Sequence, residues 1–147
     1  MDPWFIVDSA PKTARLIRTA REVNDAKPFA VIEQVYAKAN KFTAPKVACL
    51  GLTFKPNIDD LRESPALFIV KALAEKGFAE IIVVEPHIHS LPESLEGFPN
   101  LRMVPLATAL DEADILVLLV GHKQFDTIDR TLILSKIIID ACGILEI

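Results

Sequence analysis

Beyond residue 45, the hydrophobic and polar positions alternate between short apolar runs and longer segments with helical spacing. The apolar runs cover residues 46–54, 80–86, 101–105, 114–120 and 136–140. A near-continuous apolar run of this length is typical of a strand that is buried on both faces of a parallel sheet. We therefore predict five strands in this part of the chain.

Three segments between these strands are predicted as helices, over residues 65–76, 107–113 and 125–134. The first has the clearest signals, with Ser64 as N-cap, proline in the first turn and Gly77 after the last turn. Strands that alternate with helices form βαβ units with right-handed crossovers. The sequence predicts an α/β fold, namely a Rossmann-like parallel sheet with helices on both faces.

A long helix is predicted ahead of the sheet, over about residues 11–41, with Ser9 as its cap. Pro28 should kink this helix or divide it in two, because proline lacks the N–H that the helix needs. The segment is too long for a connector. It either folds back on its own domain or forms a dimer contact, and we favour the second. The chain then divides into residues 1–44, with the long helix, and the domain 45–147.

Composition narrows the class of protein. The 147 residues are 51% hydrophobic, which is enough for a folded core, and contain no run approaching the roughly 20 apolar residues of a membrane span. A net charge of −4 argues against a nucleic-acid partner. Two distant cysteines and no signal-peptide pattern predict a reducing, cytoplasmic location without disulfides.

The loop after the first strand is unusually charged. Residues 51–67 read GLTFKPNIDDLRESPAL. In open α/β sheets ligands bind beyond the carboxyl ends of the strands, where Lys55 lies and where the helix after Ser64 directs its N-terminal dipole. Arg62 adds a fork-shaped donor for phosphate or ribose oxygens, and the loop's acidic residues can hold these cations in place. The pattern alone supports an anion site and a solvated loop with surface ion pairs equally.

A dinucleotide fingerprint is missing, since Gly51 stands outside any G-x-G-x-x-G motif. Glu85 ends the second strand but follows Gly51 by 34 positions (85 − 51) rather than about 20, so we interpret it as a loop-capping residue. His87 and His89 lack a third ligand with metal spacing, and no metal site is expected. His122 and Lys123 follow the fourth strand at its carboxyl end; they either line a nucleotide pocket or are solvated loop residues, and we favour the second.

The motif GLTFKPNIDDLRESPAL closely resembles the signature of the C-terminal domain of the UDP-glucose/GDP-mannose dehydrogenase family. Residues 2–25, 83–92 and 115–125 resemble the branch that acts on UDP-N-acetyl-D-mannosamine. The resemblance implies oxidation of a sugar C6 alcohol to a carboxylate with two NAD⁺, through a cysteine thiohemiacetal and thioester. It also implies that an N-terminal domain binds NAD, that the central helix forms a homodimer, and that the C-terminal domain holds the UDP-sugar.

Carried over by residue, Phe54 and Lys55 correspond to UDP-sugar contacts, and Arg62 corresponds to an arginine that reaches NAD on the other domain. Asp2 corresponds to an aspartate that follows the nucleophilic cysteine and assists the water or proton steps. The cysteine itself would precede Met1. We therefore expect residues 1–44 to be a remnant of the catalytic loop plus the dimerisation helix, and the chain by itself to be inactive.

One departure concerns the last strand, where the family has a basic substrate contact and this sequence has Cys142. Either the substrate contact is weakened or another residue replaces it.

Three alternative functions stay open. The first is a dehydrogenase for UDP-glucose or UDP-N-acetylgalactosamine, and the second is a non-catalytic UDP-binding module. The third is a purely structural role, in which the loop charges form ion pairs and the long helix forms an oligomer.

Overall fold

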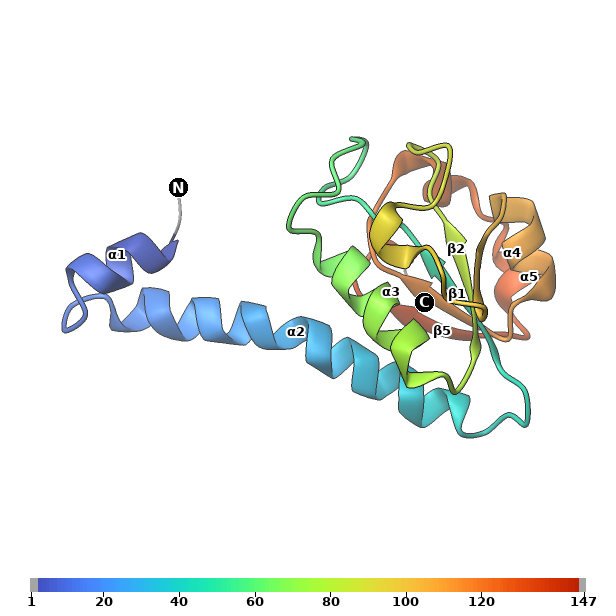
Figure 1. Ribbon diagram of the computed structural model, residues 1–147, viewed down its shortest axis with the longest axis horizontal. Helices are drawn as coiled ribbons and strands as arrows, with labels where there is room; N and C mark the ends of the chain where they lie inside the picture. Colours follow the sequence, from blue (N-terminus) through green and yellow to red (C-terminus); the bar gives the residue numbers. More distant parts are fainter. Residues whose placement is uncertain (1–2, 146–147) are drawn as a thin grey trace.

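The computed structural model describes residues 3–145, and Figure 1 shows a long helical arm attached to a domain built on one sheet. The elements in chain order are α1 (Pro3–Ser9), α2 (Arg15–Ala39), β1 (Lys46–Leu50), α3 (Pro65–Lys76), β2 (Glu80–Val84), η1 (Glu93–Leu95), β3 (Leu101–Met103), α4 (Leu106–Glu112), β4 (Ile115–Leu118), η2 (Lys123–Thr127), α5 (Arg130–Ile133) and β5 (Ile137–Asp140).

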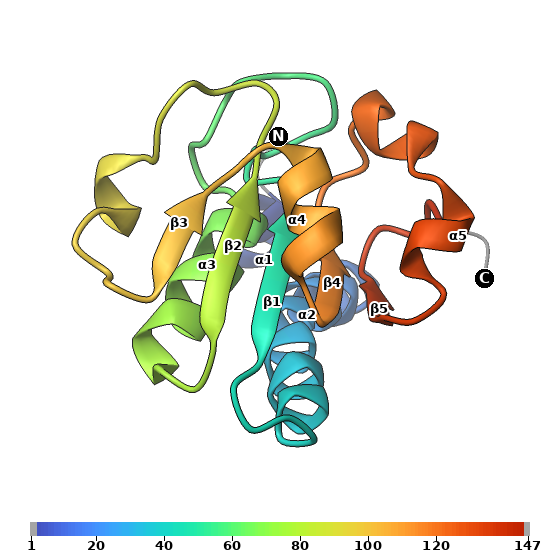
Figure 2. The same ribbon diagram turned by 90° about the vertical axis from the view of Figure 1, so that its right-hand side faces the viewer.

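The sheet confirms the predicted fold class. Its strand order is β3-β2-β1-β4-β5, and every neighbouring pair is parallel. Helices α2 and α3 cover one face, and α4 and α5 cover the other, as Figure 2 shows. Successive β1 residues therefore enter two cores: Val47 and Cys49 face α2 and α3, whereas Ala48 and Leu50 face the opposite layer. This double burial explains the continuous apolar runs of the strand sequences.

Two predicted elements are corrected. Strand β1 ends at Leu50 instead of residue 54, because Gly51 adopts a φ of 102° and turns the chain out of the sheet. The helix predicted over 125–134 is instead the short 3₁₀ helix η2 followed by α5, which begins after the N-cap Asp129. The Asp129 side chain accepts the Thr131 N–H, so the local polar residues divide the segment.

The long helix also differs from its prediction. It begins at Arg15, and Ser9 is not its cap but the last residue of α1, where its hydroxyl donates to the Ile6 carbonyl. Pro28 lies inside α2 without dividing it. Beyond Pro28, one side of the helix is buried against its own domain through Val31, Ile32, Val35 and Ala39.

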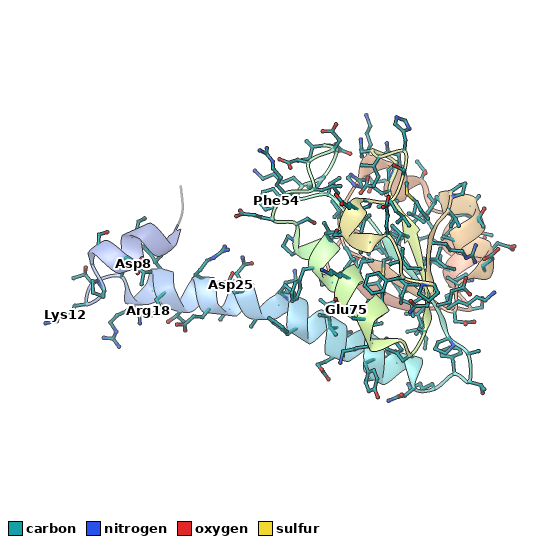
Figure 3. All side chains as sticks on the ribbon, in the orientation of Figure 1. Asp8, Lys12, Arg18, Asp25, Phe54 and Glu75 are labelled. Carbon is teal, nitrogen blue, oxygen red and sulfur yellow. The ribbon has the colours of Figure 1, made fainter. Side chains whose placement is uncertain are left out.

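The first half of α2 extends away from the sheet together with α1, where Figure 3 labels Asp8, Lys12 and Arg18. Its apolar side chains include Leu16, which is 83% exposed, and Val23, which is 68% exposed. The helix thus folds back on its own domain over one half only. Within residues 3–145, no helix is both long and apolar enough to cross a membrane.

Helix α3 matches its prediction at both ends. The Ser64 hydroxyl oxygen accepts the Leu67 N–H at 3.2 Å and donates its own proton to the Leu52 carbonyl at 2.6 Å. Gly77 ends the helix in the left-handed conformation, with a φ of 67°. The serine cap therefore joins the start of α3 to the end of β1 and fixes both ends of the charged loop between them.

Candidate functional site

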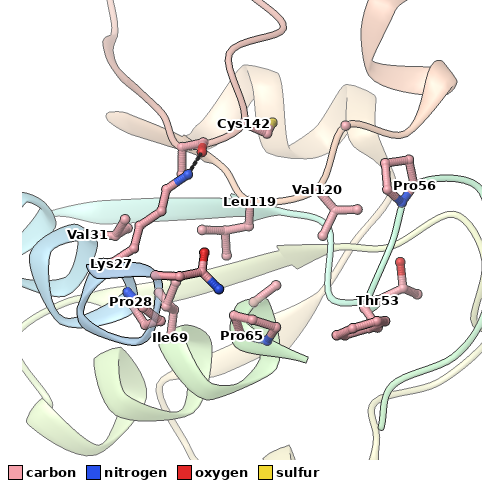
Figure 4. Close-up of a pocket in the computed structure, with 15 residues that line it drawn as sticks. Lys27, Pro28, Val31, Thr53, Pro56, Pro65, Ile69, Leu119, Val120 and Cys142 are labelled. Carbon is pink, nitrogen blue, oxygen red and sulfur yellow. Dashed lines mark hydrogen bonds between the residues drawn. The ribbon is translucent and has the colours of Figure 1, made fainter. Parts of the chain in front are cut away.

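A crevice of about 290 Å³ lies at the carboxyl ends of β1, β4 and β5, and Figure 4 shows it in close-up. Strands β1 and β4 are neighbours whose following helices, α3 and α5, lie on opposite faces of the sheet. The strand order therefore reverses between β1 and β4, and in an open α/β sheet the ligand usually binds in the crevice at such a point. The crevice is lined by Asn24, Lys27, Pro28, Val31, Thr53, Phe54, Pro56, Pro65, Ala66, Ile69, Leu119, Val120, Gly121, Ala141 and Cys142.

The lining is mainly apolar and contains a single charged side chain, Lys27. Its ammonium group extends from α2 to the end of β5 and donates to the Ala141 carbonyl at 2.7 Å (Figure 4). An apolar surface with one fixed cation suits a ligand that joins a flat, weakly polar group to an anion. Sequence reasoning missed Lys27 because its partner is 114 positions away in the chain.

The predicted pair Phe54 and Lys55 is divided: Phe54 is among the residues that line this crevice, and Lys55 is not. Phe54 lines it and is 45% exposed, and the Lys55 ammonium lies 5.7 Å from the centre of the Phe54 ring. The Phe54 N–H donates to the Asp60 carbonyl at 2.7 Å, which closes the loop on itself. An aromatic ring in the crevice lining therefore has a lysine next to it in the same loop.

Arg62 is not brought to the crevice. Its guanidinium donates to both carboxylate oxygens of Asp60, at 3.0 and 2.9 Å, and its side chain is 89% exposed. These hydrogen bonds lower the pKa of the Asp60 carboxyl to about 2. An acidic residue of the loop therefore holds Arg62, as expected, but directs it to solvent. Asp2 lies outside the residues that the structure describes.

Glu85 caps the loop, as predicted. Its side chain is buried, and its Oε2 accepts the N–H groups of Leu52 and Thr53 at 2.7 and 3.3 Å. The prediction for His122 is wrong: this residue is fully buried and its Nε2 lies 2.9 Å from the same carboxylate oxygen. The loop folds over the end of β4 and covers His122, which the sequence around His122 does not indicate.

Glu85, His87 and His122 each offer one possible metal-ligand atom, a carboxylate oxygen or a ring nitrogen. These three atoms lie within 4.8 Å of one another, a spacing compatible with metal ligands. His89 is exposed and is not part of this group. Both ring nitrogens of His122 already have protein partners, since Nε2 contacts Glu85 and Nδ1 accepts the Asn57 N–H at 2.9 Å. An ion would have to displace one of these bonds, so the geometry favours a hydrogen-bonded network over a metal site.

Cys142 lies in the crevice lining next to the carbonyl that holds Lys27. The residue is exposed, but partial desolvation of its thiol, with a further contribution from the nearby Asp140 carboxylate, raises the pKa of the Cys142 thiol to about 11. The thiol is therefore neutral near pH 7 and supplies no charge to a ligand. The cation at this end of the crevice comes from α2 instead.

The parallel sheet, the crevice at its strand reversal and the capped, lysine-bearing loop define a nucleotide-binding type of α/β domain. A sequence model for the UDP binding domain of the UDP-glucose/GDP-mannose dehydrogenase family matches residues 48–147. The chain belongs to this family.

Individual relatives agree with this assignment. The chain is 54% identical over 143 residues to the NDP-N-acetyl-D-galactosaminuronic acid dehydrogenase of Ralstonia solanacearum, matching 97% of this chain and 33% of that protein. It is 50% identical over 152 aligned positions to the UDP-N-acetyl-D-mannosamine dehydrogenase of Escherichia coli, matching 98% of this chain and 36% of that protein. The chain thus spans about a third of the length of these relatives.

Solved structures show the same fold. The UDP-N-acetyl-mannosamine dehydrogenase of Staphylococcus aureus superposes with a TM-score of 0.76 at 27% identity. The superposition covers 100% of this chain and 34% of that one. The long helix α2 is therefore part of the shared architecture, along with the sheet domain.

Proposed function

We propose that this chain is the substrate-holding part of an NAD-dependent UDP-N-acetyl-D-mannosamine 6-dehydrogenase, which oxidises the sugar C6 alcohol to a carboxylate with two NAD⁺. The observation that carries the proposal is the crevice at the β1–β4 reversal, which is lined by Phe54 and Lys27, with Lys55 next to the Phe54 ring. The family match over the surrounding domain supports it. A substrate of the N-acetylgalactosamine type is the second candidate, because the Ralstonia relative carries that name at 54% identity.

In this proposal the flat uracil and the ribose lie along the apolar floor near Phe54, and the diphosphate lies between the two lysines. The floor includes Ile69, Leu119 and Val120, which supply apolar contact area. Lys27 lines the crevice and Lys55 extends from the loop beside Phe54, so a diphosphate that reached both would gain charge-assisted hydrogen bonds from both. This chain's own task is to bind and orient the sugar nucleotide.

The residues of this domain do not fit NAD. The β1 turn has Gly51 alone, and a Cβ at that position would lie 2.6 Å from the Val120 Cβ, so the glycine serves close packing inside the domain. Phosphate-cradling glycines of the dinucleotide type are missing from the turn. We infer that NAD is held by a part of the enzyme beyond these residues, that Arg62 reaches toward it from the exposed side of the loop, and that this chain alone produces no NADH.

Calorimetric titration with UDP, UDP-N-acetylmannosamine and NAD⁺ tests the proposal. We expect both uridine compounds to bind and NAD⁺ not to bind. Lys55→Ala and Lys27→Met should each weaken UDP binding by about 10- to 100-fold, as expected from loss of a hydrogen bond to a charged group worth about 1.5–3 kcal/mol. Lys71→Ala, an exposed lysine further along α3, is the matched control and should leave the affinity unchanged. Binding of NAD⁺ without UDP, or no binding of either, would contradict the proposal.

A homodimer through α2 is the second part of the proposal. The exposed half of α2 presents Leu16 and Val23 with helical spacing, and apolar side chains exposed along one stripe are typical of a helix that pairs with a partner. Sedimentation should show a dimer, and a combined Leu16→Glu and Val23→Glu variant should be monomeric. Arg18→Glu, on the opposite side of the helix, should remain dimeric. A monomeric unmodified chain would refute this part.

A further inference from the structure

The loop that carries Phe54 and Lys55 is fastened at its tip to the chain segment after β4. Asn57 has a φ of 63°, and its backbone N–H donates to Nδ1 of His122 at 2.9 Å. The Asn57 side-chain oxygen accepts the Lys123 N–H at 3.0 Å. Two hydrogen bonds therefore hold the loop tip on residues 122 and 123.

The same histidine is tied to the base of the loop. Its Nε2 lies 2.9 Å from Oε2 of Glu85 and 3.2 Å from the Thr53 hydroxyl, and that hydroxyl donates to the Lys55 carbonyl. Glu85 in turn accepts the N–H groups of Leu52 and Thr53. The His122 and Glu85 side chains have no exposed surface. Water cannot replace a lost partner there, so each of these bonds is costly to break.

The network admits one arrangement of the histidine protons. The Asn57 backbone N–H can only donate, so Nδ1 of His122 must present a lone pair. The proton of the neutral ring is then on Nε2, where it is donated toward the Glu85 carboxylate. His122 thus connects a donor at the loop tip with an acceptor at the end of β2, and it needs both nitrogens to do so.

We propose that Glu85 and His122 form a latch that positions the binding loop, and that Nδ1 of His122 is the acceptor on which the loop-tip conformation depends. Both are positioning residues: they hold the backbone of residues 52–57, which places Phe54 in the crevice lining with Lys55 next to its ring. The effect of the latch on ligand binding rests on the proposed function, because the sugar nucleotide is taken as the ligand of the loop.

Two substitutions of His122 separate its two bonds. In His122→Asn the amide oxygen takes the place of Nδ1 and can accept the Asn57 N–H, whereas the donor to Glu85 is lost. In His122→Gln the amide nitrogen takes the place of Nε2 and keeps the bond to Glu85, whereas the acceptor for Asn57 is lost. We expect the asparagine variant to bind UDP within about threefold of the unmodified chain, and the glutamine variant to bind about tenfold more weakly or worse. His89→Asn, an exposed histidine of a neighbouring loop, is the control.

A second readout needs no ligand. Amide hydrogen exchange at Asn57 should be slow in the unmodified chain and in His122→Asn, and fast in His122→Gln, while nitrogen NMR should find the His122 proton on Nε2. The latch is refuted if Asn57 exchanges equally fast in all three proteins, if both variants lose affinity in parallel with thermal stability, or if the proton is on Nδ1. If the exchange pattern holds but the unmodified chain does not bind UDP, the latch stands and the proposed function fails.

Discussion

Gly51 should be one of the positions least tolerant of a methyl group. Its φ of 102° lies where side chains are strongly disfavoured, and a Cβ built there would lie 2.6 Å from the Val120 Cβ and 3.0 Å from the Val120 backbone nitrogen. Neither atom is the end of a flexible side chain. The Val120 backbone is itself held, since its N–H donates to the Leu50 carbonyl at 3.2 Å. In Gly51→Ala the ends of β1 and β4 must therefore move apart.

The size of the effect follows from two costs. Holding a non-glycine residue in a sparsely populated backbone region costs about 1–3 kcal/mol. Forcing an extra methyl into a filled site costs about 1–3 kcal/mol more. We expect Gly51→Ala to lower the free energy of unfolding by about 4 kcal/mol, near the middle of the summed range. Gly77 is the matched control: its φ is 67°, nothing lies within 4 Å of a Cβ there, and Gly77→Ala should cost about 1–2 kcal/mol.

Equilibrium unfolding in urea measures the free energy of unfolding of both variants. An unchanged dependence of this free energy on urea concentration checks that each variant exposes the same surface on unfolding. Because Val120 lines the crevice, Gly51→Ala should also weaken UDP binding at temperatures where it remains folded, and Gly77→Ala should not. A Gly51→Ala variant that is as stable as Gly77→Ala would refute the close-packing argument.

Three further predictions concern single side chains. Glu85→Gln places an amide where backbone donors converge and should lower the free energy of unfolding by about 2–3 kcal/mol in urea, whereas the exposed Glu75→Gln should change it by less than about 0.5 kcal/mol. The Asp60 carboxyl should titrate near pH 2 by NMR and return toward its ordinary 3.8 in Arg62→Gln. Because the pKa of Asp60 is lowered, its ion pair with Arg62 stabilises the folded loop at pH values above 3.8. That contribution is lost as the pH falls toward 2. Cys142 should react slowly with iodoacetamide at pH 8, with a rate that rises until about pH 11; a rate that levels off near pH 9 would contradict the raised pKa of its thiol.

The sheet and α3 were predictable because their signals are local. A strand between two layers needs apolar side chains on both faces, and β4 shows this directly in its sequence. The residues Ser64 and Gly77 carry the chemistry of a helix start and end within the segment itself. Glu85 was also interpretable, since it ends a strand but follows Gly51 by 34 positions (85 − 51), too many for an acid that binds ribose.

The missed features depend on distant contacts. Burial of His122 requires the loop after β1 to fold over the end of β4, and the role of Lys27 requires α2 to lie beside β5. The prediction for α2 was wrong for a related reason. Pro28 predicted a kink or a division of the helix, but α2 continues through it, because the buried side chains of Val31, Ile32 and Val35 support the helix beyond the proline through contacts with the sheet domain. Packing of this kind is not visible in a local pattern.

If the crevice at the β1–β4 reversal holds the uridine nucleotide, UDP must perturb the backbone amides that line it. Amide chemical-shift mapping by NMR during a titration with UDP measures this. We expect shifts concentrated at Phe54, Ala66, Gly121 and Cys142, with smaller changes elsewhere. Shifts concentrated instead at residues 84–90 and 103–106, on the β2–β3 side of the sheet, or a response to NAD⁺ with none to UDP, would contradict it.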